Sequence, residues 1–178
     1  MKPHVERITK IDAVRRQLRT AIRMFFEDKD TVSAYTLAVA VEGILEGLLK
    51  QKAVRHPLRE SDLIRPERKK EFLQILDRPR NFFKHAATDP NEVLEFNSVM
   101  LSHILIECSM LYEMYSGRSL REGWVFFVWF GIHYPDVVRE SPLRDALAVF
   151  KEQAPDIAAD KAVFLEMLNS AEFRPNAD

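Results

Sequence analysis

The sequence predicts an all-α protein, a helical bundle with additional helices at its C-terminal end. Apolar residues recur at steps of three and four along most of the 178 residues, which is the period of an amphipathic helix. Capping residues and prolines stand where these stretches begin. Apolar residues make up 47% of the chain and charged residues 30%, a balance typical of a globular domain with a sizeable core. We therefore expect a single all-α domain over residues 1–178.

The first predicted helix covers residues 5–27 and has two contrasting sides. Its apolar side carries Ile8, Ile11, Val14, Leu18, Ile22 and Phe25. Its opposite side carries Arg15, Arg16, Arg19 and Arg23. Such a row of arginines is usually a solvated helix face, and the alternative is a surface that follows the phosphates of a nucleic acid.

The second predicted helix begins after a cap at Asp30 or Thr31 and runs to about Lys52. It is apolar around most of its circumference, so we expect it at the centre of the bundle. Small residues recur along it at Ala34, Ala38, Gly43 and Gly47. They would let another helix approach closely, within the bundle or across a dimer. In this apolar setting Glu42 and Glu46 must be paired, hydrated or bound to a ligand, because burying a bare charge is costly.

The middle of the chain is predicted to hold two short helices and a long one. Residues 53–65 are irregular, and Pro66 then starts a helix that ends at Asp77-Arg78-Pro79. A second short helix starts at that proline and stops by Ala87-Thr88. Asp89-Pro90-Asn91-Glu92 combines a cap, a first-turn proline and an acid. A long helix with Val93 in its core stripe should run from there to about residue 115.

Residues 116–178 are predicted to add a helical layer. Ser119-Leu120-Arg121-Glu122 has the spacing of a capping box, which favours a buried helix over a buried strand for Trp124–Ile132. We expect the aromatic residues of that run in the core or on a partner surface. Two more helices are expected over residues 142–153 and about 156–171.

The stretch with the clearest chemistry is Arg78-Pro79-Arg80-Asn81-Phe82-Phe83-Lys84-His85. It sets two guanidinium groups, an amide, an amine and an imidazole around two large apolar rings. On a helix Asn81 and His85 are four residues apart and share a face. Arg80 lies about 140° from His85 around the helix axis. The long side chain of Arg80 would have to reach around the helix to the face of His85. Otherwise Arg80 of a second copy of the chain would have to lie beside His85.

Arg80-Asn81, followed by three residues and His85, resembles the Arg-x(4–6)-His signature of the HEPN superfamily. The resemblance implies a small all-α bundle, here residues 1–115, that forms a homodimer. It also implies a metal-independent endoribonuclease whose paired motifs line a cleft between protomers. Arg80, Asn81 and His85 would be its catalytic residues, and Arg78 and Lys84 would bind flanking phosphates of the RNA. Such a toxin or defence protein would also have an antitoxin or another protein partner.

Other interpretations of the motif stay open. His85 at a helix C-terminus would interact favourably with the helix dipole. Arg80 would form a salt bridge with Asp77 or Glu71. The second function that the sequence supports is accordingly a non-catalytic helical module of the HEPN fold, which binds a protein or nucleotide partner through the same cleft.

A metal centre is the main rival chemistry. Glu42, Glu46, His103 and Glu107 form two i, i+4 pairs on two long predicted helices. Helix bundles that bind two metal ions use Glu-x-x-His on two helices, and the sequence contains no such motif. We therefore expect neither a metal nor another cofactor.

The charge distribution bears on nucleic-acid binding and localisation. The net charge of −1 argues against general nucleic-acid affinity. Residues 50–85 nevertheless have a balance of +6, which would concentrate a polyanion near the motif, or simply form a solvated helix face. Cys108 is the single cysteine, no secretory leader is evident, and the longest apolar run has nine residues. These features predict a cytoplasmic protein that does not enter a membrane.

Overall fold

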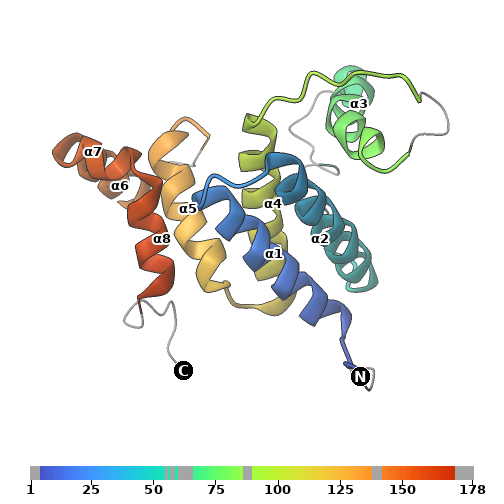
Figure 1. Cartoon of the computed structure of the whole chain (residues 1–178), viewed down its shortest axis with the longest axis horizontal. Helices are drawn as coiled ribbons and strands as arrows, with labels where there is room; N and C mark the ends of the chain where they lie inside the picture. The colour runs from blue at the N-terminus through green and yellow to red at the C-terminus, as the bar shows by residue number, and fades with distance from the viewer. Residues whose placement is uncertain are drawn as a thin grey trace.

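A computed structural model describes residues 5–54, 56, 59, 66–85, 90–137 and 142–170 of the chain. Within these residues the regular secondary structure is helical, without a strand, which confirms the all-α class (Figure 1). The helices of the described residues are α1 (Lys10–Phe26), α2 (Thr31–Gln51), α3 (Pro66–Phe82), α4 (Val99–Ser116), α5 (Arg121–His133), α6 (Pro142–Gln153), α7 (Pro155–Ala159) and α8 (Lys161–Asn169).

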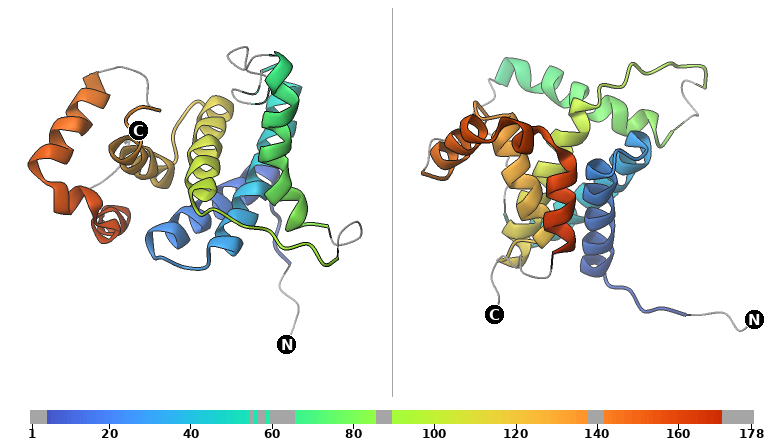
Figure 2. Two further views of the ribbon diagram at one scale, coloured as in Figure 1. Left: turned by 90° about the horizontal axis from the view of Figure 1, so that it is seen from above. Right: turned by 60° about the vertical axis from the view of Figure 1, so that its left-hand side comes forward.

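Four helices form the centre of the molecule. α1 packs against α2 and α5, and α4 packs against the same two helices. α8 lies against α1 and α5, and α6 covers another part of α5. α3 lies at one edge of the molecule, on the side of α2 and away from α8 (Figures 1 and 2). The fourth helix of the bundle, α5, therefore comes from the part of the chain that follows residue 115.

Aliphatic side chains fill the centre of the bundle. Val14 and Leu18 of α1, Leu45 of α2 and Leu105 of α4 are completely buried. They belong to one core that extends to Leu168 of α8. α2 supplies part of this core but packs mainly on α1 and α4 among the described helices, and Gly43 and Gly47 face open space. Contrary to our expectation, its all-round apolar character therefore does not place it at the centre of the bundle.

Aromatic rings join α1 to α5 and α8. Phe25 meets Trp129 edge to face, with ring centroids 4.6 Å apart. Phe26 stacks on Phe164 at 5.7 Å. Phe126 is completely buried beside them, so the aromatic run of α5 enters the core.

The arginines of α1 bind other parts of the chain. Three cross to neighbouring helices: Arg15 to Tyr112 at 2.9 Å, Arg19 to Glu122 at 3.2 Å and Arg23 to Asn169 at 3.0 Å. Arg16 pairs with Glu6 at 2.5 Å. Three of these arginines therefore link α1 to α4, α5 and α8. This arrangement does not favour the alternative of a surface that follows the phosphates of a nucleic acid.

The motif lies at the end of one helix, not on a helix of its own. We expected a break at Asp77-Arg78-Pro79, but α3 continues through Pro79. A proline removes one helical hydrogen bond, the one that its missing N–H would donate. The carbonyl of Pro79 accepts from the N–H of Phe83 at 3.1 Å, which carries the turn onward. The expected end at Ala87-Thr88 lies outside the described residues.

The long helix after the motif begins later than predicted. Residues 90–98 are not helical, and α4 begins at Val99. Val93, which we expected in the core, is 82% exposed. The expected cap, Asp89, lies outside the described residues.

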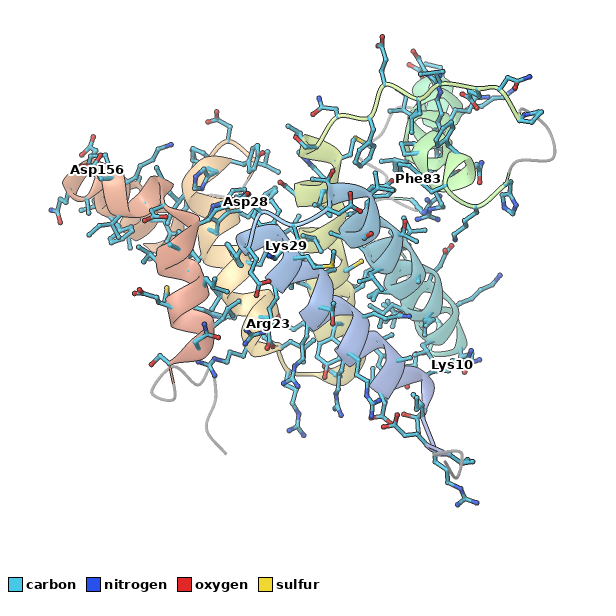
Figure 3. All side chains as sticks on the ribbon, viewed as in Figure 1. Lys10, Arg23, Asp28, Lys29, Phe83 and Asp156 are labelled. Carbon is cyan, nitrogen blue, oxygen red and sulfur yellow. The ribbon has the colours of Figure 1, made fainter. Side chains whose placement is uncertain are left out.

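A second aromatic cluster explains this late start. The ring of Phe96 meets Tyr35 of α2 at 5.0 Å and Phe83 at 5.3 Å, both edge to face. Phe83 lies between α3 and α2 (Figure 3). Burying Phe96 in this cluster draws its segment along α3, so the chain turns into α4 only after the ring is in place.

The C-terminal part is helical as predicted but differs in its boundaries. α5 confirms a helix for Trp124–Ile132, yet the capping box is wrong because Ser119 donates to Glu113 at 2.7 Å. The last expected helix is divided into α7 and α8 at Asp160. Asp160 caps α8 by accepting from the N–H of Ala162 at 2.8 Å.

One side of α2 has no neighbour in the described part of the chain. Ala34 and Ala38 are completely buried, but nothing lies within 4 Å of a Cβ built at Gly43 or Gly47. A close helix approach at the two glycines within the protomer is therefore wrong, and an approach across a dimer stays a prediction. By length and composition α2 would also reach across a membrane, although 44% of its most apolar window is buried in the bundle.

We expect Leu45→Ala to lower the free energy of unfolding by about 2–5 kcal/mol, because it leaves a cavity in the centre of the bundle. Urea unfolding followed by circular dichroism measures this change. Ile75→Ala is the matched control, since Ile75 is largely exposed, and its effect should stay below about 1 kcal/mol. Equal losses in both variants would contradict the burial of Leu45 in the core.

Candidate functional site

The motif residues point in two directions at the end of α3. Asn81, Lys84 and His85 are exposed. His85 follows the last helical residue, and its N–H donates to the carbonyl of Asn81 at 2.9 Å. The helical turn thus keeps Asn81 and His85 together, while the side chain of Arg80 turns inward and is only 16% exposed.

Asn81 and His85 line an open depression on the surface of α3. Its residues are Gln74, Asp77, Arg78, Asn81, Phe82, His85 and Glu92, and its volume is about 670 Å³. We call this concavity the motif depression. Arg78 lies in it with its side chain 62% exposed and paired with Glu92 at 3.2 Å. The depression therefore brings an imidazole, an amide and a guanidinium to one solvent-facing surface.

Arg80 belongs to a different environment on the inner side of α3. Its guanidinium forms an ion pair with the carboxylate of Glu42, which is 2% exposed in the middle of α2. Asp77, one turn earlier, lies 3.9 Å from the same guanidinium. Burial lowers the pKa of Arg80 from its usual value, yet an arginine stays charged at any ordinary pH. The salt bridge to Asp77 is one of the two that the sequence suggested for this residue.

Arg80 is one member of a buried charge cluster. The cluster consists of Glu42, His56, Arg59, Asp77, Arg80 and Glu107. Arg59 bridges two acids, at 3.2 Å from Glu42 and 2.7 Å from Asp77. Three carboxylates and two guanidinium groups thus meet where α2, α3 and α4 come together.

His56 has a defined protonation pattern in this cluster. Its Nδ1 accepts the backbone N–H of Arg59 at 3.1 Å. The proton of the neutral ring is therefore on Nε2, which faces the carboxylate of Glu107 at 3.3 Å. The imidazole consequently presents a donor to the acid and not a lone pair.

The protonation of Glu107 is strongly affected by its burial. Burial raises its pKa to about 7, although the nearby guanidinium groups of Arg59 and Arg80 oppose this shift. Desolvation is the largest cause of the shift, so it favours the protonated acid near neutral pH.

The cluster also contains the residue types of a metal site. Ligand atoms of Glu42, His56 and Glu107 lie within 4.8 Å of one another. Glu42 and Glu107 were two of the four metal candidates in the sequence, but Glu46 is exposed and His103 packs against Phe130. Since both arginines pair with Glu42 and Nε2 of His56 carries the proton, the groups form an ion-pair network more readily than a coordination sphere.

Sequence reasoning missed His56 and Arg59. Both lie in the stretch 53–65 that we classed as irregular, where no periodicity marks an inward side chain. The available signal was indirect, because an acid in the apolar α2 needs a partner. That argument left Glu42 and Glu46 as paired, hydrated or bound to a ligand, and it did not name Arg80 as a partner.

Comparisons of the chain with protein-family models, with curated proteins and with solved structures found no match.

We expect Arg80→Met to lower the free energy of unfolding by roughly 3 kcal/mol, because it leaves Glu42 buried with one cation fewer. Arg78→Met is the matched control from the same helix. Its exposed ion pair should contribute less than about 1 kcal/mol. Urea unfolding measures both values, and similar losses would show that the pair with Glu42 is not buried.

The stability of the protein should respond to Glu107. Its proton is held up to about pH 7 in the folded protein and is released near the ordinary value of 4.5 in the unfolded chain. Between these values the folded state binds more protons, so this group makes stability fall as pH rises, by up to about 3 kcal/mol. Unfolding of the parent and of Glu107→Gln from pH 5 to pH 8 measures the effect. The parent should lose stability relative to the variant, and parallel profiles would refute the raised pKa.

Proposed function

We propose that this protein is a HEPN-like, metal-independent endoribonuclease that acts as a cytoplasmic homodimer. The supporting observation is the motif depression, where His85, Asn81 and Arg78 surround one open concavity of about 670 Å³. A proton-transfer group and donors for a phosphate are what RNA cleavage requires when no metal takes part. The all-α fold agrees with the resemblance carried by Arg80, Asn81 and His85.

The reaction assigns His85 to proton transfer. One imidazole takes the proton of an RNA 2′-hydroxyl, whose oxygen attacks the adjacent phosphorus. A second imidazole gives a proton to the departing 5′-oxygen. The products are a 2′,3′-cyclic phosphate and a 5′-hydroxyl. Because each chain has one His85, the two proton transfers require two protomers, and this requirement is the reason for proposing a dimer.

The phosphate is held by the polar groups around the imidazole. The planar guanidinium of Arg78 matches two phosphate oxygens, and its partner Glu92 is on the surface, where an RNA phosphate competes with it. Asn81 donates to the phosphate or orients His85. Lys84 is exposed beside them and binds a flanking phosphate.

Arg80 acts in this proposal as a positioning residue. Its ion pair with Glu42 holds the end of α3 against α2, and Asn81 and His85 follow directly in the chain. Direct contact between Arg80 and RNA would require its release from Glu42. Since an unrestrained ribonuclease harms its host, we propose a toxin or defence role with an antitoxin or other protein partner.

The second candidate function is a non-catalytic HEPN-like module. The commitment of Arg80 to Glu42 favours it, because that guanidinium is then withheld from substrate. Such a module would use the motif depression to bind a phosphate-bearing partner without cleaving it.

Incubating the purified protein with labelled RNA in EDTA distinguishes the two functions. We expect cleavage that ends in a 2′,3′-cyclic phosphate. His85→Ala should reduce its rate by about 10²–10⁴-fold, because it removes the proton-transfer group. Arg78→Met should reduce it by about tenfold or more, which corresponds to a lost charged hydrogen bond.

His103→Gln is the control, because it changes an exposed histidine on α4. It should cleave like the parent. Binding of RNA by the parent without cleavage would favour the non-catalytic module, and cleavage that survives His85→Ala would exclude the proposed site.

A further inference from the structure

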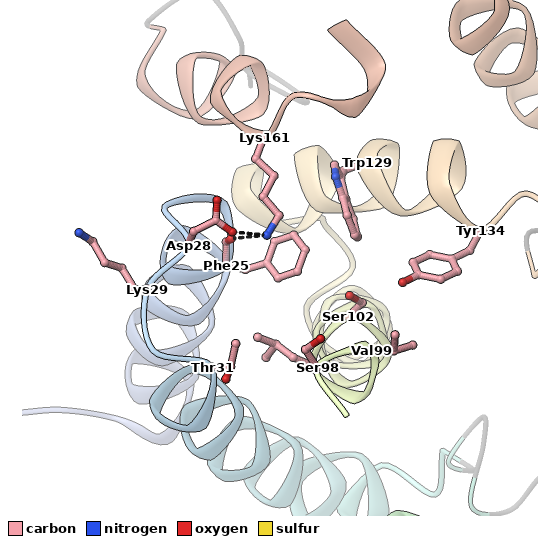
Figure 4. Close-up of a pocket in the computed structure, with 11 residues that line it drawn as sticks. Phe25, Asp28, Lys29, Thr31, Ser98, Val99, Ser102, Trp129, Tyr134 and Lys161 are labelled. Carbon is pink, nitrogen blue, oxygen red and sulfur yellow. Dashed lines mark hydrogen bonds and ion pairs between the residues drawn. The ribbon is translucent and has the colours of Figure 1, made fainter. Parts of the chain in front are cut away.

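A second concavity lies away from the motif, and none of its residues lines the motif depression. It occupies about 270 Å³ between the α1–α2 turn, the start of α4, α5 and the start of α8. We call it the distal pocket. Figure 4 looks along α4 into it, with Ser98 and Ser102 below and the ring of Trp129 above.

The hydroxyl groups of Ser98, Ser102 and Tyr134 line the distal pocket. Ser102 is 3% exposed, and its hydroxyl makes no hydrogen bond within the described residues. Another buried serine of α4, Ser109, donates to the carbonyl of Leu105 at 2.8 Å. Ser98 and Tyr134 likewise have no hydroxyl partner in the part of the chain that the structure describes, and Figure 4 shows the Tyr134 hydroxyl directed toward Ser102. Ser98 is exposed and Tyr134 half-buried, so these hydroxyls open into the pocket, where a polar ligand can form hydrogen bonds with them.

The opposite wall of the pocket is apolar. It is formed by Phe25 and Trp129, which meet edge to face and are both buried. The indole N–H of Trp129 has no hydrogen-bond partner among the described residues. A ligand would therefore meet hydroxyls on one side and aromatic rings on the other, the usual division of a small-molecule site.

The charge of the pocket favours an anion. The ammonium of Lys161 lies 2.6 Å from Asp28 and 4.0 Å from the centre of the Phe25 ring. The first residues of three helices line the pocket, namely Thr31 of α2, Val99 of α4 and Lys161 of α8. Helix N-termini carry partial positive charge. Lys161 is already paired with Asp28 and also donates to the carbonyl of Phe25 at 3.2 Å. The positive charge in excess of that pair therefore comes from the helix N-termini and from Lys29 at the rim.

We propose that the distal pocket binds a small organic anion, an aromatic carboxylate of one ring in size. The hydroxyls of Ser98, Ser102 and Tyr134 hold its acidic group close to Lys161. Its ring lies against Phe25 and Trp129. A volume of about 270 Å³ leaves no room for a nucleotide chain, so this site is separate from the proposed RNA-binding surface and does not depend on it.

Tryptophan fluorescence tests the proposal directly. The chain has two tryptophans, so a Trp124→Phe background leaves Trp129 as the only reporter. Benzoate is the probe, and benzamide is its neutral counterpart of the same shape. We expect benzoate to change the emission of Trp129 saturably with a Kd of about 1 mM, which corresponds to about −4 kcal/mol. Benzamide should bind at least tenfold more weakly.

Variants locate the binding site. Lys161→Met should weaken benzoate binding at least tenfold, and Ser102→Ala about three- to tenfold. Lys50→Met is the matched control, because Lys50 is exposed at the end of α2 and does not line the pocket. Its Kd should equal that of the parent. Circular dichroism checks that each variant is folded, and Ser102→Ala removes a single oxygen, so it remains informative if Lys161→Met unfolds.

Three results would overturn the proposal. They are the absence of a saturable response to benzoate, equal binding of benzamide, and a Kd that Ser102→Ala leaves unchanged. RNA cleavage does not enter these measurements, so their failure and that of the proposed ribonuclease are distinguishable.

Discussion

The buried carboxylate of Glu42 determines where the motif segment 78–85 lies on the bundle. Glu42 is 2% exposed in an apolar helix, and a charge in that position needs cations close by. Arg80 of α3 and Arg59 supply them. Among the described residues α3 has few close contacts with other helices, so this ion pair and the Phe83–Phe96 rings contribute to holding it in place. The position of the whole motif segment therefore depends on an acid almost forty positions earlier in the sequence.

The same geometry connects the interior of the protein with its surface. Asp77 lines the motif depression and also binds Arg59 inside the cluster. Asp77 is therefore the residue that the buried charge cluster and the motif depression share. Within one protomer, the arginine of the Arg-x4-His pattern supports the structure from the inner side, and its amide and imidazole face solvent. Successive residues of a helix point about 100° apart, so Arg80 can face the interior while Asn81 faces solvent.

Local signals were enough to predict much of the fold. Asp30 caps α2 and Pro66 begins α3, because caps and first-turn prolines act within a few residues of where they stand. The start of α4 was wrong because Phe96 packs on rings from two other helices, a contact that no local pattern encodes. His56 and Arg59 were missed for the same reason. The sequence shows that Glu42 needs partners, but only the packing of α3 against α2 decides which cations reach it.

Cys108 has a practical consequence. It is completely buried, its thiol donates to the carbonyl of Ala38 at 3.3 Å, and burial raises its pKa well above the usual range. The native chain therefore offers no reactive sulfur to labelling reagents. A cysteine introduced at the exposed Lys84 position would be the unique attachment point for a spin label. The distance between two such labels would then report directly how a pair of subunits arranges its α3 helices.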